Sequence, residues 1–263
     1  MRVHPYFDIP RPHLFGHRGA SGEAPENTMV AFERALAYGV PYLEMDCHAT
    51  HDGEIVIHHD DTLERTTDSP RPISELRFAE LERVDAGFRF TADGGRTFPF
   101  RGAGVRVPRL GEVLAAFPHA RVNLEVKQAE PPIAEEVVRI VRRARAESRL
   151  LLAAEDEAVL AKVRALDPGT ALGSSLVDVV EFVRAGAEGR LDSFAPRGHA
   201  LQVPTHALGR PLVTADFLRA AHARGLEVHV WTINEPDEMR RLLALGVDGV
   251  MSDFPDRLVA AAR

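Results

Sequence analysis

Residues 121–154 read RVNLEVKQAEPPIAEEVVRIVRRARAESRLLLAA and contain one complete strand–helix–strand unit. Its two ends, 121–127 and 149–154, are short apolar runs of strand length. Between them, residues 133–146 carry apolar side chains at helical spacing. Strands that alternate with helices in this way are typical of a parallel α/β fold. The same alternation continues in both directions along the chain.

The alternation predicts eight strands, at 14–17, 42–46, 121–127, 149–154, 170–174, 200–203, 227–233 and 249–253. It predicts helices at 28–38, 110–117, 133–146, 157–166, 177–187, 214–224, 236–245 and 255–262. No stretch resembles a linker, so residues 1–263 are expected to form a single catalytic domain. Eight strand–helix units predict a TIM (β/α)8 barrel, a fold of about 250 residues. A doubly wound sheet is the alternative, but residues 16–28, GHRGASGEAPENT, lack its usual glycine-rich phosphate loop.

The composition limits the class of partner. The chain of 263 residues has 32 Lys and Arg against 39 Asp and Glu, a net charge of −7, which argues against a general nucleic-acid binder. Cys47 is the single cysteine, so no intramolecular disulfide can form, and we expect it to be a small buried residue. The N-terminus has no apolar signal region, and no stretch approaches the roughly 18 apolar residues of a membrane span. These observations predict a cytoplasmic protein without a transmembrane segment, either a monomer or a homodimer.

Two segments depart from the simple alternation. An Asp52-Gly53 pair between extended runs predicts a hairpin that brings His58 and His59 back to the end of the second strand. Residues 61–107 are far longer than the usual connection of about 2–6 residues, so we expect an inserted lobe on the catalytic face. This lobe contains four phenylalanines, which either form a small satellite core or wall a pocket for a substrate alcohol or acyl group: Phe88, Phe90, Phe98 and Phe100.

Charged residues gather where the predicted strands end, which is the catalytic face of such barrels. Glu44 and Asp46 lie two apart on one strand and therefore share a face, and Glu125 and Lys127 do the same on the next. Three carboxylates and a lysine would then crowd one barrel mouth. Either these groups neutralise one another or a cation lies among them, and oxygen ligands suit Mg²⁺ or Ca²⁺.

Two histidines follow neighbouring strands, His17 beside Arg18 and His59 after the hairpin. Cleavage of a phosphoester needs one group to remove a proton from the nucleophile and another to protonate the leaving oxygen. Two imidazoles can divide these tasks, while Arg18, Lys127 and a metal stabilise the phosphoryl oxygens. The residues therefore indicate a phosphodiesterase site. Trp231, at the end of the seventh strand, either walls this pocket or packs in the core.

The chain resembles the glycerophosphodiester phosphodiesterase family from residue 14 to about residue 258. The resemblance rests on HRG (17–19), PENT (25–28), ExD (44–46), HDxxLxRTT (59–67), PxL (108–110), NLEVK (123–127), VHVWTIN (228–234) and DGVMSDFP (248–255). It implies a TIM barrel with an inserted lobe and one divalent cation, Mg²⁺ or Ca²⁺, held by Glu44, Asp46 and Glu125. It also implies that His17 and His59 act as general acid and base.

The same resemblance implies that Arg18 and Lys127 contact the phosphate and that Trp231 lines the alcohol pocket. In the family, the substrate's own glycerol hydroxyl is thought to attack, giving a cyclic phosphate that water opens to glycerol 3-phosphate. The expected substrates are small glycerophosphodiesters such as glycerophosphocholine or glycerophosphoethanolamine. Lysophospholipids are the alternative substrates if the phenylalanines of the lobe form an acyl groove. A barrel that only binds phosphoesters is the non-enzymatic alternative.

Four further residues have two interpretations each. Many family members read Ser-Phe-Asp where this chain has residues 154–156, so Glu155 either favours a cationic or hydroxylated head group or simply opens the next helix. Glu26 and Asn27 either order the His17 loop or cap the first helix, and we expect the cap. Asp253 either orients a catalytic residue or forms an ion pair across the rim.

Overall fold

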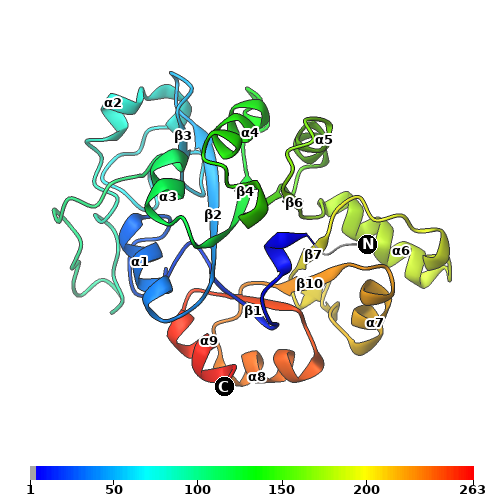
Figure 1. Cartoon of the computed structure of the whole chain (residues 1–263). Coiled ribbons are helices and arrows are strands. Elements are labelled where there is room, and N and C mark those ends of the chain that lie inside the picture. Colours follow the sequence, from blue (N-terminus) through cyan, green and yellow to red (C-terminus); the bar gives the residue numbers. More distant parts are fainter. Residues whose placement is uncertain (1–3) are drawn as a thin grey trace.

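The structure, a computed structural model, describes residues 4–263 and confirms the predicted barrel (Figure 1). Its eight parallel strands are β1 (His13–Gly16), β2 (Tyr42–Ala49), β4 (Arg121–Val126), β5 (Leu150–Ala153), β6 (Ala171–Leu172), β7 (Ala200–Val203), β10 (Glu227–Val230) and β11 (Gly249–Ser252). The surrounding helices are α1 (Met29–Ala37), α3 (Leu110–Ala116), α4 (Ala134–Arg143), α5 (Glu157–Ala165), α6 (Leu176–Ala187), α7 (Ala215–Ala223), α8 (Pro236–Leu245) and α9 (Pro255–Ala261). Every predicted strand and helix overlaps one of these elements.

The strands follow one another around the ring in the order β6-β5-β4-β2-β1-β11-β10-β7. The ring is nearly closed between β6 and β7, where Gly173 pairs with Ala200 in an isolated parallel bridge. His199 N also donates to Leu172 O across this junction at 2.7 Å. Gly198 permits the close approach, because a Cβ there would clash with the carbonyl oxygen of Gly173.

The alternation of side chains along β2 explains how one strand serves both core and site. Leu43, Met45 and Cys47 pack in the apolar layer between the barrel and its helices, and all three are fully buried. Glu44 and Asp46 point the opposite way, into the barrel. The expectation that Cys47 is a buried residue is thus confirmed.

The chain's first described residues cover the end of the barrel opposite the site. The short helix η1 (Pro5–Phe7) crosses the middle of the ring in Figure 1. Its Tyr6 and Phe7 pack with Phe15 and Tyr42 inside the barrel, and Tyr42 Oη donates to Tyr6 O at 2.8 Å. This end of the barrel is therefore filled by aromatic side chains.

The predicted hairpin after the second strand is confirmed. Strand β3 (Ile55–Ile57) pairs antiparallel with the end of β2, and Ala49 lies opposite Ile55. His58 N donates to Asp46 O at 2.9 Å, so the chain returns to the point where the β2 carboxylates lie.

Residues 61–107 contain only the short helices η2 (Ile73–Glu75) and α2 (Phe78–Leu81). A satellite core does form here, but its members are Val56, Leu63, Ile73, Leu76, Phe78, Leu81, Val84, Ala86 and Val107. The phenylalanines singled out from the sequence lie outside this cluster: Phe88, Phe90, Phe98 and Phe100. They are half-buried and pack partly on one another and on Arg101, so the assignment of the satellite core to them is wrong. The interpretation of 61–107 as a lobe on the catalytic face stays a prediction.

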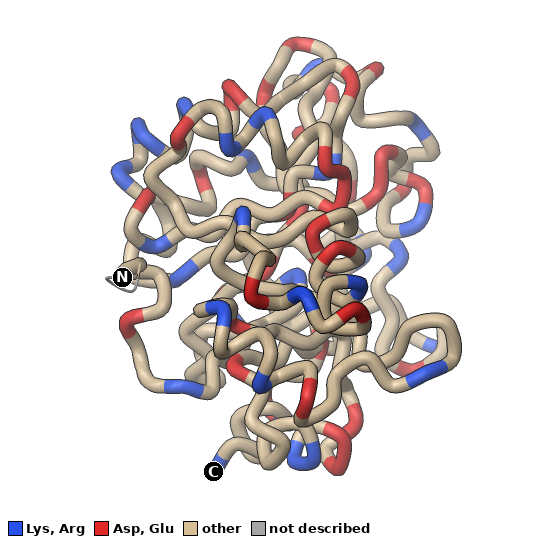
Figure 2. Tube along the Cα trace, turned by 90° about the vertical axis from the view of Figure 1, so that its right-hand side faces the viewer, with Lys and Arg blue, Asp and Glu red and all other residues tan. Residues whose placement is uncertain are grey.

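The remaining elements are short segments between the barrel strands and helices. A small hairpin of β8 (His206–Ala207) and β9 (Arg210–Pro211) follows β7, and the turns η3 (Glu147–Arg149) and η4 (Leu191–Ser193) precede β5 and β7. Among residues 4–263, no helix combines the length and apolar character needed to cross a bilayer. Basic and acidic positions are interspersed along the chain on the side shown in Figure 2.

Candidate active site

A pocket of about 380 Å³ opens where the barrel strands end. All eight residues that the sequence singled out for catalysis or binding line it: His17, Arg18, Glu44, Asp46, His59, Glu125, Lys127 and Trp231. They come from the ends of β1, β2, β4 and β10 and from the turn after β3. The fold thus gathers into one pocket residues that are up to 214 positions apart in the sequence.

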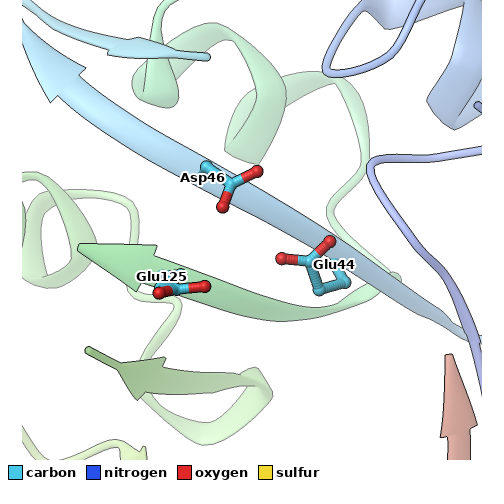
Figure 3. Close-up of side chains that lie close together, drawn as sticks. All are labelled: Glu44, Asp46 and Glu125. Atoms are coloured by element: carbon cyan, nitrogen blue, oxygen red, sulfur yellow. The ribbon is translucent and has the colours of Figure 1, made fainter. Parts of the chain in front are cut away.

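Three carboxylates form the polar side of the pocket. Glu44 and Asp46 project from β2 and Glu125 from β4, and the three side chains point toward one another (Figure 3). Asp46 lies directly opposite Glu125 in the parallel register of the two strands. Each residue offers an oxygen, and these atoms lie within 4.8 Å of one another. Glu44 and Asp46 are almost fully buried.

The electrostatics of this cluster fit a divalent cation. Burial, and then the charge of Asp46, raise the pKa of Glu44 to about 8, and burial raises the pKa of Glu125. Lys127 Nζ lies 3.0 Å from Glu125 Oε1 and 3.5 Å from Asp46 Oδ1 but supplies only one positive charge. Three hard oxygen donors with too little positive charge around them form a set that could hold an ion such as Mg²⁺ or Ca²⁺.

Arg18 and Lys127 are the cations that face this pocket. The Arg18 backbone has φ 53°, and its N–H donates to Glu44 Oε2 at 2.9 Å. Its guanidinium bonds to Glu26 at 2.9 Å and approaches Asp46 to 3.4 Å. Burial opposes the charge of Lys127, but Glu125 and Asp46 outweigh it and raise the lysine pKa. Both cations therefore remain charged beside the space where a phosphate could bind.

Asn27 has a different role from the one we expected. Thr28, not Asn27, caps α1, since its extended backbone lets the side chain accept from Ala31 N. Asn27 has φ 57° and is 1% exposed, and its Nδ2 donates to Asp46 Oδ2 at 2.9 Å. The cap prediction is wrong because the left-handed backbone of Asn27 turns its amide toward the acidic cluster. Asn27 thus holds one of the candidate metal ligands.

His17 is held by a carboxylate on its far side from the pocket. Its Nδ1 donates to Asp253 Oδ1 at 2.7 Å, and Asp253 also accepts from Ser21 Oγ and from Asn234 Nδ2. Burial opposes the charged imidazole, but the hydrogen bond to Asp253 and the charges of Glu44 and Asp253 together outweigh it and raise the pKa of His17. Asp253 therefore fixes the ring of His17 through an ion pair between the ends of β1 and β11, and the catalytic role of His17 stays a prediction. Nε2 of His17 is left to face the pocket, 3.8 Å from Glu44.

His59 is held in the same manner from the opposite loop. Its Nδ1 donates to Asp60 Oδ1 at 2.6 Å, which leaves Nε2 available to a substrate. Two neighbouring histidines fix the turn around it: His48 Nε2 donates to His59 O at 3.0 Å, and His58 Nδ1 donates to Asp60 O at 2.9 Å. Because its ring is occupied in this way, His48 supports the His59 backbone, not the acidic cluster.

The other side of the pocket is apolar. Leu176 and Val179 of α6, Val203 at the end of β7 and Trp231 line it, and Trp231 remains 42% exposed. Glu155 also lines the pocket, and its carbonyl oxygen accepts from Leu176 N at 3.0 Å. None of the four phenylalanines of the 61–107 segment lines the pocket, so the described residues do not support an apolar wall made by them.

The sequence reasoning missed several supporting residues. Asp60 and Arg65 belong to the HDxxLxRTT motif, Asn234 ends the VHVWTIN motif and Ser21 lies two residues after HRG, but a motif does not state which atoms meet. Gln202, in the middle of a predicted strand, donates to Asn123 Oδ1 at 2.9 Å at the pocket floor. Its inward-facing strand position was the one available signal.

Comparison with known proteins now decides the family. Residues 17–257 match the Glycerophosphoryl diester phosphodiesterase family. The chain belongs to this family. A glycerophosphodiester phosphodiesterase of Bacillus altitudinis is 31% identical over 252 residues, which span 94% of this chain and 96% of that protein. A human lysophospholipase D is 29% identical, over 92% of this chain and 83% of that protein.

A solved structure of a family member adds a ligand. An Oleispira antarctica phosphodiesterase, solved in complex with the product sn-glycerol-3-phosphate, superposes with a TM-score of 0.76 and 27% identity. The match covers 95% of this chain and 96% of that one. This member of the glycerophosphoryl diester phosphodiesterase family is therefore an enzyme, a phosphodiesterase built on a TIM barrel, and a mere phosphoester-binding barrel is set aside.

Proposed function

We propose that the protein hydrolyses glycerophosphodiesters, such as glycerophosphocholine or glycerophosphoethanolamine, to glycerol 3-phosphate and an alcohol. The observation that carries this proposal is the pairing of two imidazoles, each fixed through Nδ1 by its own carboxylate, around one pocket that also holds two cations and three clustered carboxylates. The product bound to the Oleispira relative supports the choice of substrate.

The proposed division of labour follows from the charges and donors in the pocket. Arg18 and Lys127 bind the phosphodiester oxygens and oppose the charge that develops on them. One histidine takes the proton from the attacking hydroxyl through Nε2, and the other gives a proton to the leaving oxygen. Asp253 and Asp60 keep each ring in the tautomer that presents Nε2 to the substrate.

Glu44, Asp46 and Glu125 are the proposed ligands of the divalent cation. When bound, Mg²⁺ or Ca²⁺ would supply Lewis-acid stabilisation of phosphoryl charge. Trp231 is proposed to wall the space for the departing alcohol, and Glu155, which lines the same pocket, would favour a cationic or hydroxylated head group.

The test is release of choline and glycerol 3-phosphate from glycerophosphocholine with Mg²⁺, with Ca²⁺ or with EDTA. His17→Ala and His59→Ala should each lower kcat by about 10²–10⁴-fold, the usual share of acid–base catalysis. His51→Ala is the matched control, because His51 is exposed and lies outside the pocket. Wild-type turnover that survives in both active-site variants would reject the two-histidine assignment.

Lysophospholipids are the second candidate, favoured by one specific observation. Helix α6 exposes an apolar stripe, with Leu176 55%, Val177 43%, Val180 57% and Val183 41% exposed. Leu176 also lines the pocket, so an apolar path leads from the reacting centre onto the helix surface. A human relative carries the name lysophospholipase D. An acyl chain would then follow α6, not the phenylalanines of 61–107.

A single position can separate the two substrate classes. Val180→Asp should lower turnover of lysophosphatidylcholine several-fold and leave glycerophosphocholine turnover unchanged, whereas Val180→Leu keeps the stripe apolar and should keep both activities. Equal effects of Val180→Asp on both substrates would reject the acyl path.

A further inference from the structure

A chain of ion pairs joins the loop of His59 to the loop of Arg18. Asp60, which accepts from His59, also binds Arg65, with Arg65 Nε 2.6 Å from Asp60 Oδ2. Arg65 then grips Glu26 with both of its terminal nitrogens, at 2.7 Å each. Glu26 in turn accepts from Arg18 Nη1 at 2.9 Å.

Glu26 is at the centre of this series of ion pairs and is largely shielded from solvent. Its side chain is 19% exposed, yet it lies between two guanidinium groups. Burial alone would raise its pKa, but the hydrogen bonds from Arg65 and the charges of both arginines lower it to about 2. The carboxylate is therefore ionised throughout the working pH range, and its two-pronged contact with Arg65 has the directional geometry that a planar guanidinium provides.

These ion pairs connect two loops that lie 39 positions apart in the sequence. Arg65 lies in the irregular stretch after β3, and Glu26 lies in the loop between β1 and α1. Among the described residues, Arg65 alone forms ion pairs with the carboxylates of both Asp60 and Glu26. Arg71 in the same stretch forms an ion pair with Glu80, whose carboxylate is 49% exposed, whereas the two carboxylates bound by Arg65 are 19% and 25% exposed.

We propose that Glu26 and Arg65 are positioning residues that fix His59 and Arg18 relative to each other. Arg65 holds Asp60, which fixes the orientation of the His59 imidazole, and Glu26 holds the Arg18 guanidinium directly. This inference rests on the proposed function for the roles of His59 and Arg18. It predicts that a substitution at Asp60 also disturbs the position of Arg18, and that a substitution at Glu26 also disturbs the position of His59.

The test is a double-mutant cycle on glycerophosphocholine turnover with Asp60→Asn, Glu26→Gln and their combination. Asp60→Asn should lower kcat about 10–100-fold with little change in KM, because supporting partners of reactive groups usually carry effects of that size. Glu26→Gln should lower kcat and also raise KM, because Arg18 loses its anchor. The double variant should lose less than the product of the two single losses.

The control and a second readout keep the result decisive. Glu80→Gln breaks the exposed Arg71 pair of the same segment and should leave kcat and KM unchanged. Arg65→Lys retains a charge but cannot grip two carboxylates, and it should shift the Nδ1–H resonance of His59 in proton–nitrogen NMR spectra, as Glu26→Gln should from a greater distance. Thermal unfolding of each variant identifies those that fail to fold.

The outcomes separate the two proposals. The positioning role of Glu26 and Arg65 would be overturned if the double variant lost the full product of the two single losses in kcat. It would also be overturned if the His59 resonance did not move in Arg65→Lys and Glu26→Gln, even if wild type cleaves glycerophosphocholine. If wild type did not cleave glycerophosphocholine but the resonance shifts were present, the proposed substrate would be overturned and the positioning role of Glu26 and Arg65 would remain supported.

Discussion

Asn27 offers the sharpest test of how the acidic cluster is held, and its variants can be ranked in advance. Asn27→Ala removes the donor to Asp46 Oδ2 at 2.9 Å, and a lost hydrogen bond to a charged group costs about 1.5–3 kcal/mol. Alanine must also adopt φ near 57°, a left-handed backbone that costs about 1–2 kcal/mol for an ordinary residue. We therefore expect Asn27→Ala to lower the free energy of unfolding by about 2.5–5 kcal/mol.

Asn27→Gly separates the two contributions. Glycine accepts the left-handed backbone freely but loses about 0.4–1 kcal/mol through the greater freedom of its unfolded chain. The glycine variant should therefore be more stable than the alanine variant by about 1 kcal/mol, and both should fall below wild type.

Urea unfolding at 25 °C in EDTA measures these differences without a contribution from bound metal. The reasoning would be refuted by an alanine variant within about 0.5 kcal/mol of wild type, or by one more stable than the glycine variant. The first result would mean that Asn27 does not hold Asp46, and the second that its backbone carries no cost.

Three further outcomes follow from other contacts. Without metal, Glu44→Gln should be more stable than wild type at neutral pH, because the folded pKa of Glu44 is raised to about 8 and the carboxyl therefore destabilises the fold as pH rises above its unfolded pKa. With Mg²⁺ the order of stability should reverse, and calorimetric titration should show that Glu44→Gln has lost affinity for Mg²⁺. Because the pKa of His17 is raised, its ion pair with Asp253 stabilises the fold most below the ordinary histidine pKa, and this stabilisation is lost as pH rises through the raised value. Asp253→Asn in EDTA should therefore lower Tm more at about pH 5.5 than at about pH 8.5. Gly19→Ala should lower Tm by several degrees, because its Cβ would lie 2.6 Å from the backbone of Ala31 while φ is +84°.

The barrel could be predicted because its local and global signals agree. Period-two alternation in β2 separates Leu43 and Met45 from Glu44 and Asp46, and the same rule applied to β4 puts Glu125 in the same pocket. Strand ends in such a barrel converge on one face, so residue type and strand position, with the hairpin that returns His59, were enough to bring together the eight candidate residues.

The supporting contacts could not be predicted, since they depend on loop geometry that has no period. Asn27 and Thr28 are both good capping types, and only their backbone angles, φ 57° and −122°, decide which one caps the helix. Glu26 and Arg65 meet across 39 positions through two irregular loops. The sequence motifs placed Glu26 and Arg65 near the site but did not indicate which residues they contact.

The charges in the pocket explain how an acidic protein can bind an anion. When Glu44, Asp46 and Glu125 are all ionised, they carry three negative charges against the two positive charges of Arg18 and Lys127, and burial together with this excess raises the pKa of Glu44 without a cation. A phosphodiester adds another negative charge, and two like charges 4 Å apart repel by about 4 kcal/mol at the effective dielectric near a protein surface. A divalent cation among the carboxylates would turn the excess positive, so cation and substrate should each tighten the binding of the other. The net charge of −7 has no direct bearing on this, because the balance that a bound phosphodiester meets is set within a few ångströms of it.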